Sequence, residues 1–280
     1  DIRKKAGFRS SEARITGMLH LDMLQFIRNI FGKNLKTDSY SLNAVSHELL
    51  DSKKHDVDIN NLAHVWDHDH DKLEDFCKYN LHDAHLTYQL CKKLLFDILE
   101  FTKIVGLPSH NVIRMRFSKL VENYILKRAI EYNVIAPNKP IGSEMKERME
   151  ESIQGAFVYE PTPGIYENIV VFDFRSLYPT IITAHNIGPE SLQCDCCKAN
   201  KVPGREQYWF CSQDRKFIPT VLEQLVLRRV DLKRLIKDAR NKNEDTRILD
   251  SRSYALKILA NSFYGYLGFF NFSTADGIQI

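Results

Sequence analysis

An aspartate that directly follows a short apolar run is the first residue whose place suggests chemistry. The run, Ile169 to Phe172, is rich in β-branched residues, which predicts a buried strand. The end of a strand holds a side chain rigidly, and Asp173 occupies that end. Its carboxylate could therefore fix a divalent metal ion against a transferring phosphate group. Because many aspartates after strands are only turn residues, this interpretation depends on the neighbouring sequence.

Three polar residues further along the chain share one face of an expected helix. Lys257, Asn261 and Tyr264 stand at i, i+4 and i+7 within residues 246–264, whose apolar periodicity predicts a helix. A cation, an amide and an aromatic ring on one face suit a triphosphate and a base. Residues 220–240 predict a second helix, and the polar link 241–245 would join the two as a helical hairpin.

Positive charge is concentrated in this hairpin. Residues 228–257 contain ten Lys/Arg and five Asp/Glu, a net charge of +5, whereas the whole chain of 280 residues carries +3. Such a segment is either a solvated helix face or a surface for phosphates. The chain is 44% hydrophobic and 27% charged, which excludes wholesale disorder. No apolar run approaches the roughly 18 residues of a membrane helix, so no membrane partner is expected.

The remaining elements are expected to be mostly helical. Polar caps and apolar periodicity predict helices over residues 38–50, 72–100 and about 117–133. Residues 189–216 are polar and rich in turn formers, which predicts a loop insertion.

Two blocks of sequence resemble motifs A and B of family B DNA polymerases. Residues 173–179 read Asp-x-x-Ser-Leu-Tyr-Pro, and residues 257–265 read Lys-x-x-x-Asn-Ser-x-Tyr-Gly. Both blocks in the order of the family are hard to obtain by chance. From about Ile15 onward the chain is similar to an archaeal-type member of this family. The resemblance implies template-directed DNA synthesis, in which deoxynucleotides are added to a primer 3′ end, with associated 3′–5′ proofreading.

The first block supplies metal and sugar contacts in the family. By this resemblance Asp173 is a catalytic, metal-binding aspartate of the palm, and Tyr178 is the steric gate beneath the sugar. The backbone around Ser176 and Leu177 would lie near the phosphates of the nucleotide.

The second block and the helix before it supply the remaining nucleotide contacts. Lys257 resembles the fingers lysine that contacts the triphosphate and acts as a general acid. Asn261 and Tyr264 would line the nascent base pair. Arg229 and Lys233 match the Arg-x-x-x-Lys pair that grips the triphosphate, which would explain the charge of the hairpin.

An earlier segment resembles the third exonuclease motif of the family. Tyr79 and Asp83 have its Tyr-x-x-x-Asp spacing, in which the Asp binds metal and the Tyr orients the attacking water. The spacing alone is also typical of a capped surface helix. The first two exonuclease motifs and the Tyr-Gly-Asp-Thr-Asp motif C are not found in this sequence. We therefore expect an internal fragment, or half of a split enzyme, that is inactive alone.

The fold class that the resemblance implies is α+β and multidomain. Its parts would be the C-terminal part of a ribonuclease-H-like 3′–5′ exonuclease domain (1–95), a helical connector (96–136), the first part of the palm with a Cys-rich insertion (137–218), helical-hairpin fingers (219–268) and the start of the return to the palm (269–280). Implied partners are primer–template DNA, deoxynucleoside triphosphates, a sliding clamp, and a second polypeptide with motif C and the thumb. The resemblance also implies two Mg²⁺ ions, whose site residues outside this chain would complete. If the protein is archaeal, it implies a cytoplasmic, nucleoid-associated location.

Four cysteines crowd into the expected loop insertion. Cys194, Cys196, Cys197 and Cys211 form the pattern Cys-x-Cys-Cys-x13-Cys. Relatives from hot environments have a disulfide at positions that look like Cys197 and Cys211. Four thiolates could instead bind Zn²⁺, although adjacent Cys196 and Cys197 are awkward as joint ligands. Free thiols are the third alternative.

Two rival functions belong to other classes. A non-catalytic DNA-binding subunit derived from a polymerase need not keep Asp173, Tyr178, Lys257 and Asn261. A structural metal-binding module built on the cysteines leaves both polymerase motifs unexplained.

Overall fold

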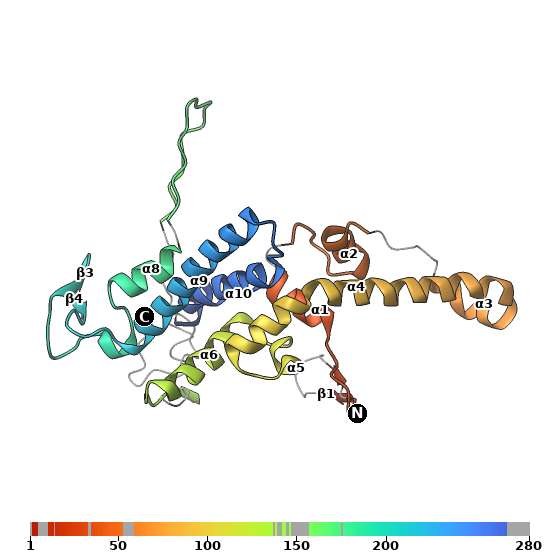
Figure 1. The fold of residues 1–280 in the computed structure, drawn as a ribbon, viewed down its shortest axis with the longest axis horizontal. Helices are drawn as coiled ribbons and strands as arrows, with labels where there is room; N and C mark the ends of the chain where they lie inside the picture. Colours follow the sequence, from red (N-terminus) through yellow and green to blue (C-terminus); the bar gives the residue numbers. More distant parts are fainter. Residues whose placement is uncertain are drawn as a thin grey trace. The chain divides into compact units, whose positions relative to one another are not determined.

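The computed structural model describes residues 2–4, 11–13, 15–32, 35–52, 59–136, 138, 142–143, 146, 157–174 and 176–267. The described part is mostly helical, and its sheets are two small antiparallel pairs (Figure 1). The chain divides into two compact units, one of Asp1–Leu120 with Asp245–Ala255 and the other of Val121–Glu244 with Leu256–Ile280. Among the described residues, none of the helices is long and apolar enough to cross a membrane. The expected return to the palm, 269–280, lies outside the described residues.

A long helix, α4 (Leu73–Val105), organises the first unit. Its first turn carries Glu74 and Asp75, whose charges suit the positive end of the helix dipole. The helix ends at Gly106, which takes a φ of 79° and donates its N–H to the Thr102 carbonyl at 2.8 Å. The helix predicted over residues 72–100 is therefore confirmed, and it extends to Val105.

The apolar stripe of α4 is the core of the first unit. Short helices pack against it, and the ring of Phe26 meets that of Phe101 edge to face at 6.4 Å. The helix predicted within residues 38–50 is confirmed as α2, which Ser41 caps by accepting the Ala44 N–H at 3.3 Å. The packing helices are α1 (Met23–Phe26, continued by a π turn Ile27–Phe31), α2 (Leu42–Leu50), α3 (Leu62–His68) and α5 (Ser109–Val112); the strands β1 (Ile2–Lys4) and β2 (Ser11–Ala13) pair antiparallel.

The first turns of α10 (Arg247–Leu267) also belong to this unit. Glu100 of α4 is only 2% exposed, and its carboxylate accepts hydrogen bonds from Arg252 Nε at 2.7 Å and Lys103 Nζ at 3.0 Å. The ring of Tyr254 stacks on Phe31 with centroids 5.3 Å apart. An ion pair and an aromatic stack therefore hold the start of α10 in the first unit.

The second unit is built mainly from α9 (Phe217–Asn241) and the rest of α10. Leu222 and Leu225 of α9 and Leu259 and Phe263 of α10 are fully buried. The helix α6 (Phe117–Glu131) joins them through Tyr124, whose ring meets Phe263 edge to face at 6.4 Å. The short helix α8 (Leu177–Ala184) packs on α9. The predicted helical hairpin and the helix predicted near 117–133 are thus confirmed.

The segment predicted as a loop insertion is more ordered than expected. Within residues 189–216 the chain forms an antiparallel hairpin of β3 (Asn200–Val202) and β4 (Arg205–Phe210). Gly204 makes the tight turn between the two strands with a φ of 73°. The prediction missed this hairpin because its strands are short and carry charged residues.

The strand predicted at Ile169–Phe172 is wrong. These residues are not in regular structure, and their side chains are strongly exposed, from 67% at Ile169 to 91% at Phe172. Figure 1 shows the surrounding green segment extending out from the region of α8. A strand needs a hydrogen-bonding neighbour, and the described residues pair only β1 with β2 and β3 with β4. The apolar pattern was typical of a strand, but no partner strand lies beside it in the described part.

Candidate functional site

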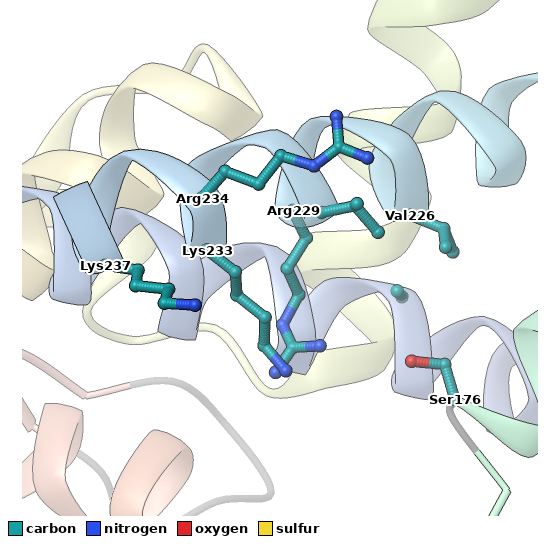
Figure 2. Close-up of a pocket in the computed structure, with 8 residues that line it drawn as sticks. Ser176, Val226, Arg229, Lys233, Arg234 and Lys237 are labelled. Atoms are coloured by element: carbon teal, nitrogen blue, oxygen red, sulfur yellow. The ribbon is translucent and has the colours of Figure 1, made fainter.

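A pocket of about 340 Å³ in the second unit collects several of the expected nucleotide contacts (Figure 2). Ser176 lines it from the start of α8, and Ala260 lines it from α10. The other lining residues all come from α9: Val226, Arg229, Val230, Lys233, Arg234 and Lys237. The fold therefore brings Ser176 to the Arg-x-x-x-Lys pair, although the two lie far apart in the sequence.

The helical period of α9 gives this pocket its positive charge. Arg229, Lys233 and Lys237 follow one another at i, i+4 and i+8, so they share one face of the helix. Figure 2 shows Arg229 and Lys233 extending in the same direction, whereas Arg234 extends the other way. None of the eight lining residues is acidic. The pocket is therefore suited to an anion with several charges, because neighbouring cations repel each other less when one ligand neutralises them all.

Ser176 stands at the entrance to α8 with unusual backbone geometry. Its φ of 51° and ψ of 56° are left-handed, and its carbonyl accepts the Thr180 N–H at 2.9 Å. The first N–H groups of a helix have no partner within the helix and attract anions. Pro179 in the first turn lacks an N–H altogether and so costs no hydrogen bond there. Ser176 therefore lines the pocket and also directly precedes the positive, N-terminal end of α8.

Two tyrosines from the two motifs meet directly. Tyr178 of α8 and Tyr264 of α10 stack with ring centroids 4.2 Å apart and planes inclined by 10°. Both rings are about half exposed, at 46% and 50%. Lys257 and Asn261 lie on α10 as expected, and both are exposed, but neither lines the pocket. Leu177, also exposed, follows Ser176 in α8.

Asp173 is not brought to this pocket. It is exposed in the irregular segment before α8 and is not among the lining residues. The cysteines form the single group of three or more Cys, His, Asp or Glu able to hold an ion among the described residues. The described part of the chain therefore assembles a cationic pocket but no cluster of three or more carboxylates beside it.

Tyr79 and Asp83 lie one turn apart on α4 in the first unit, and both are half-buried. The Thr87 hydroxyl donates to the Asp83 carbonyl at 2.9 Å. The geometry is that of consecutive turns of a continuous helix. Among the described residues, Asp83 belongs to no group of three or more Cys, His, Asp or Glu able to hold an ion.

The four cysteine sulfurs of the insertion come together. Cys194 and Cys197 have sulfurs 3.5 Å apart, and so do Cys196 and Cys211. All six cysteines of the chain are free thiols, and these closest pairs differ from the Cys197–Cys211 pairing that the resemblance implied. Hydrogen bonds from the hydroxyl and N–H of Ser212 lower the pKa of Cys197 to about 6. The hydrogen bond with the Cys211 thiol raises the pKa of Cys196 to about 12.

Sequence reasoning missed two charged residues of the pocket, Arg234 and Lys237. A signal for Lys237 was present, because it continues the row of Arg229 and Lys233 by one further helical turn. Arg234 carries no such signal. It extends away from that row and pairs with Asp231 at 3.6 Å on the surface.

Comparison with known proteins agrees with the sequence motifs. The profile of DNA polymerase family B matches residues 107–274, more than half of the chain. The chain is 36% identical over 255 residues to a DNA polymerase of Pyrococcus glycovorans, covering 91% of this chain and 32% of that protein. It is also 36% identical over 260 residues to DNA polymerase 1 of Pyrococcus abyssi, covering 93% of this chain and 33% of that protein.

A solved structure shows the same likeness in three dimensions. The structure of the family B DNA polymerase from the hyperthermophilic archaeon Pyrobaculum calidifontis superposes with a TM-score of 0.71 at 27% identity. The match covers 88% of this chain and 32% of that one, so the chain spans about a third of the length of these relatives. On this evidence of sequence and structure, the chain belongs to family B of the DNA polymerases and is similar to its archaeal-type members.

Proposed function

We propose that this chain is the nucleotide-binding part of an enzyme that adds deoxynucleotides to a primer 3′ end under the direction of a template. The observation that carries the proposal is the pocket that joins Ser176, the N-cap residue of α8, to Arg229 and Lys233 of α9. A triphosphate carries several negative charges on neighbouring groups. A helix N-terminus and a pair of cations on the facing helix are the protein groups that bind such an anion.

The cations have distinct parts in this proposal. Arg229 offers a planar, bidentate donor set to phosphate oxygens, and Lys233 adds a compact charge one turn away. Lys257, on the exposed face of α10, contacts the triphosphate from the other helix of the hairpin and donates a proton to the leaving pyrophosphate. Asn261 lines the nascent base pair with Tyr264. These contacts hold the reacting phosphate in place, which is most of what phosphoryl transfer requires of a protein.

The metal requirement of the family is not met by the described residues. Two-metal catalysis needs carboxylates that bridge two ions, and Asp173 is an exposed carboxylate outside any described acidic cluster. In our proposal Asp173 is one ligand, and further carboxylates come from a polypeptide that carries motif C and the thumb. Proofreading likewise needs carboxylates beyond Asp83, with Tyr79 orienting the water.

The proposed division of the chain follows from these roles. Residues 1–95 would be the end of the exonuclease domain, 96–136 a helical connector and 137–218 the first part of the palm. Residues 219–268, which contain α9 and most of α10, would be the fingers, and 269–280 would return to the palm. Primer–template DNA, a sliding clamp and deoxynucleoside triphosphates would be partners of the assembled enzyme.

Nucleotide binding to the purified chain tests the proposal. Titration calorimetry with dATP in chelator should detect binding, and Arg229→Ala and Lys233→Ala should each weaken it about tenfold, since a charge-assisted hydrogen bond contributes about 1.5 kcal/mol. Arg228→Ala is the matched control, because Arg228 is the exposed neighbour of Arg229 and does not line the pocket. Duplex DNA bound without any dATP binding would favour the rival, a non-catalytic DNA-binding subunit.

A further inference from the structure

The four cysteines between α8 and α9 have the spacing of a metal centre. All four sulfur atoms lie within 4.8 Å of one another, and two of the separations are 3.5 Å. Zinc bound tetrahedrally by thiolates at about 2.3 Å places its sulfurs about 3.8 Å apart. The cluster is therefore close to the size that one zinc ion requires, with all four ligands supplied by the chain.

The β-hairpin brings the last cysteine back to the first three. Gln193 donates its N–H to the Trp209 carbonyl at 2.8 Å, and the Trp209 indole donates to the Cys194 carbonyl at 3.1 Å. Cys211 donates its N–H to the Ser191 carbonyl at 2.8 Å, and its side chain is buried. Main-chain pairing of residues 191–193 with residues 209–211 thus holds Cys211 beside the Cys194 segment without any bond between sulfurs.

The adjacent cysteines, which looked awkward as joint ligands, have room in this geometry. The sulfur of Cys196 lies against that of Cys211, whereas the sulfur of Cys197 lies against that of Cys194. Cys197 also accepts hydrogen bonds from the N–H of Ser212 at 3.3 Å and its hydroxyl at 3.5 Å. Such donors to sulfur are the outer contacts that orient and stabilise metal-bound thiolates.

We propose that Cys194, Cys196, Cys197 and Cys211 bind one structural Zn²⁺ ion. Four thiolates in a closed tetrahedral site leave no open position for substrate, which is typical of structural rather than catalytic zinc. Binding releases the thiol protons to solvent, and no redox step is involved. A bound ion would cross-link the three cysteines that precede the hairpin to Cys211, which follows it. The binding step is independent of the polymerase role proposed above.

The position of the site indicates which part of the fold the ion would stabilise. Asn186, just after α8, donates from Nδ2 to the carbonyls of Cys211 at 2.7 Å and Asp214 at 2.9 Å. Its Oδ1 accepts the N–H of Lys216, the N-cap residue directly before α9, at 3.0 Å. The cysteine loop is therefore attached to the end of α8 and the start of α9. The zinc ion would stabilise the placement of these two helices, which carry Ser176 and Arg229.

Metal analysis of the intact purified chain tests this directly. Chain prepared with a reducing agent and dialysed against zinc-free buffer should retain one zinc per chain by mass spectrometry of the metal. Cys196→Ser, at an exposed position that tolerates a hydroxyl, should lose it. Cys77→Ser, at an exposed thiol of α4, is the matched control and should keep it. Cobalt added to metal-free chain should give the visible absorption bands of tetrahedral thiolate coordination.

Three results would overturn the proposal. They are a folded chain without metal, iron in place of zinc, or a thiol count reduced by a disulfide within the cluster. Circular dichroism of Cys196→Ser separates loss of metal from loss of fold. Stripping zinc with a strong chelator should lower the melting temperature, and added zinc should restore it. Because none of these measurements uses a nucleotide, failure of the polymerase proposal would leave them unchanged.

Discussion

Tyr178 of α8 and Tyr264 of α10 stack face to face, with ring centroids 4.2 Å apart and planes inclined by only 10°. One ring belongs to the first polymerase motif and the other to the second, so the contact joins the two motifs in space. In the proposed function Tyr178 lies beneath the sugar and Tyr264 beside the base pair. If this proposal holds, a nucleotide that uses both rings must come between them or displace one.

The stack should be measurable as a coupling between the two tyrosines. Stacked rings contribute about 0.5–1 kcal/mol beyond the area that they bury, and half-exposed rings lie at the lower end of this range. A double-mutant cycle of Tyr178→Ala and Tyr264→Ala, followed by urea unfolding, should show a coupling free energy of that size. Tyr264→Phe keeps the ring and should retain it. Additive single effects would mean that the rings do not interact in solution.

Removal of the Tyr178 ring should relax the choice between sugars. The ring is proposed to exclude the 2′-hydroxyl of a ribonucleotide, so Tyr178→Ala should bring the dissociation constants for ATP and dATP closer together. The measurement is the ratio of the two constants by titration calorimetry on this chain. Tyr88→Ala, at an exposed ring of α4, serves as the control. An unchanged ratio in Tyr178→Ala would disprove the role as a steric gate.

Helices were predictable from this sequence because their signals are local. Ser41 before α2 and Gly106 after α4 are cap residues, and the leucines of α4 repeat at the helical period. The face shared by Arg229 and Lys233 also follows from spacing along one helix. What spacing could not provide is the approach of Ser176 to that face, which depends on how α8 packs on α9.

The features that the sequence did not predict correctly share a physical cause: each depends on contacts with residues distant in the sequence. Ile169–Phe172 has the composition of a buried strand, but a strand exists only where another strand accepts its hydrogen bonds. The β3–β4 hairpin was missed because cross-strand pairing stabilises it rather than apolar alternation. Adjacent Cys196 and Cys197 looked awkward as joint ligands, and the sequence could not show that the sulfur of Cys196 lies against Cys211 and that of Cys197 against Cys194.

Asp173 should be separable from nucleotide binding. It is exposed and does not line the cationic pocket, so Asp173→Asn should leave dATP binding in chelator unchanged. The chain can also be combined with a polypeptide that carries motif C and the thumb, as the proposal requires. In that mixture Asp173→Asn should abolish extension of a labelled primer, because a metal ligand is lost. Glu167→Gln, in the same exposed segment, should affect neither. Undiminished extension by Asp173→Asn would refute its assignment as a metal ligand.

The buried ion pair of Glu100 with Arg252 should make the stability of the first unit depend on pH. Burial alone would raise the pKa of Glu100, but hydrogen bonds from Arg252 and Lys103 outweigh it, so this pKa lies below its ordinary value of 4.5. A carboxyl group whose pKa is lower in the folded state stabilises the fold above its unfolded pKa. That stabilisation is lost as the pH falls through the folded pKa.

Arg252→Met tests this linkage. The variant leaves Glu100 buried, with Lys103 as its remaining cation partner among the described contacts. The free energy of unfolding at neutral pH should therefore fall by about 2 kcal/mol. This is less than for a fully buried pair, because the Arg252 side chain is 40% exposed. The deficit should shrink as the pH falls below 4.5 and through the lower folded pKa of Glu100, because protonation of Glu100 then removes the ion pair from the unsubstituted chain as well. Lys78→Met, which breaks an exposed pair with Glu74, should change little at either pH. A deficit of equal size at both pH values, measured by urea unfolding, would show that Arg252 stabilises the unit through packing of its stem rather than through its charge.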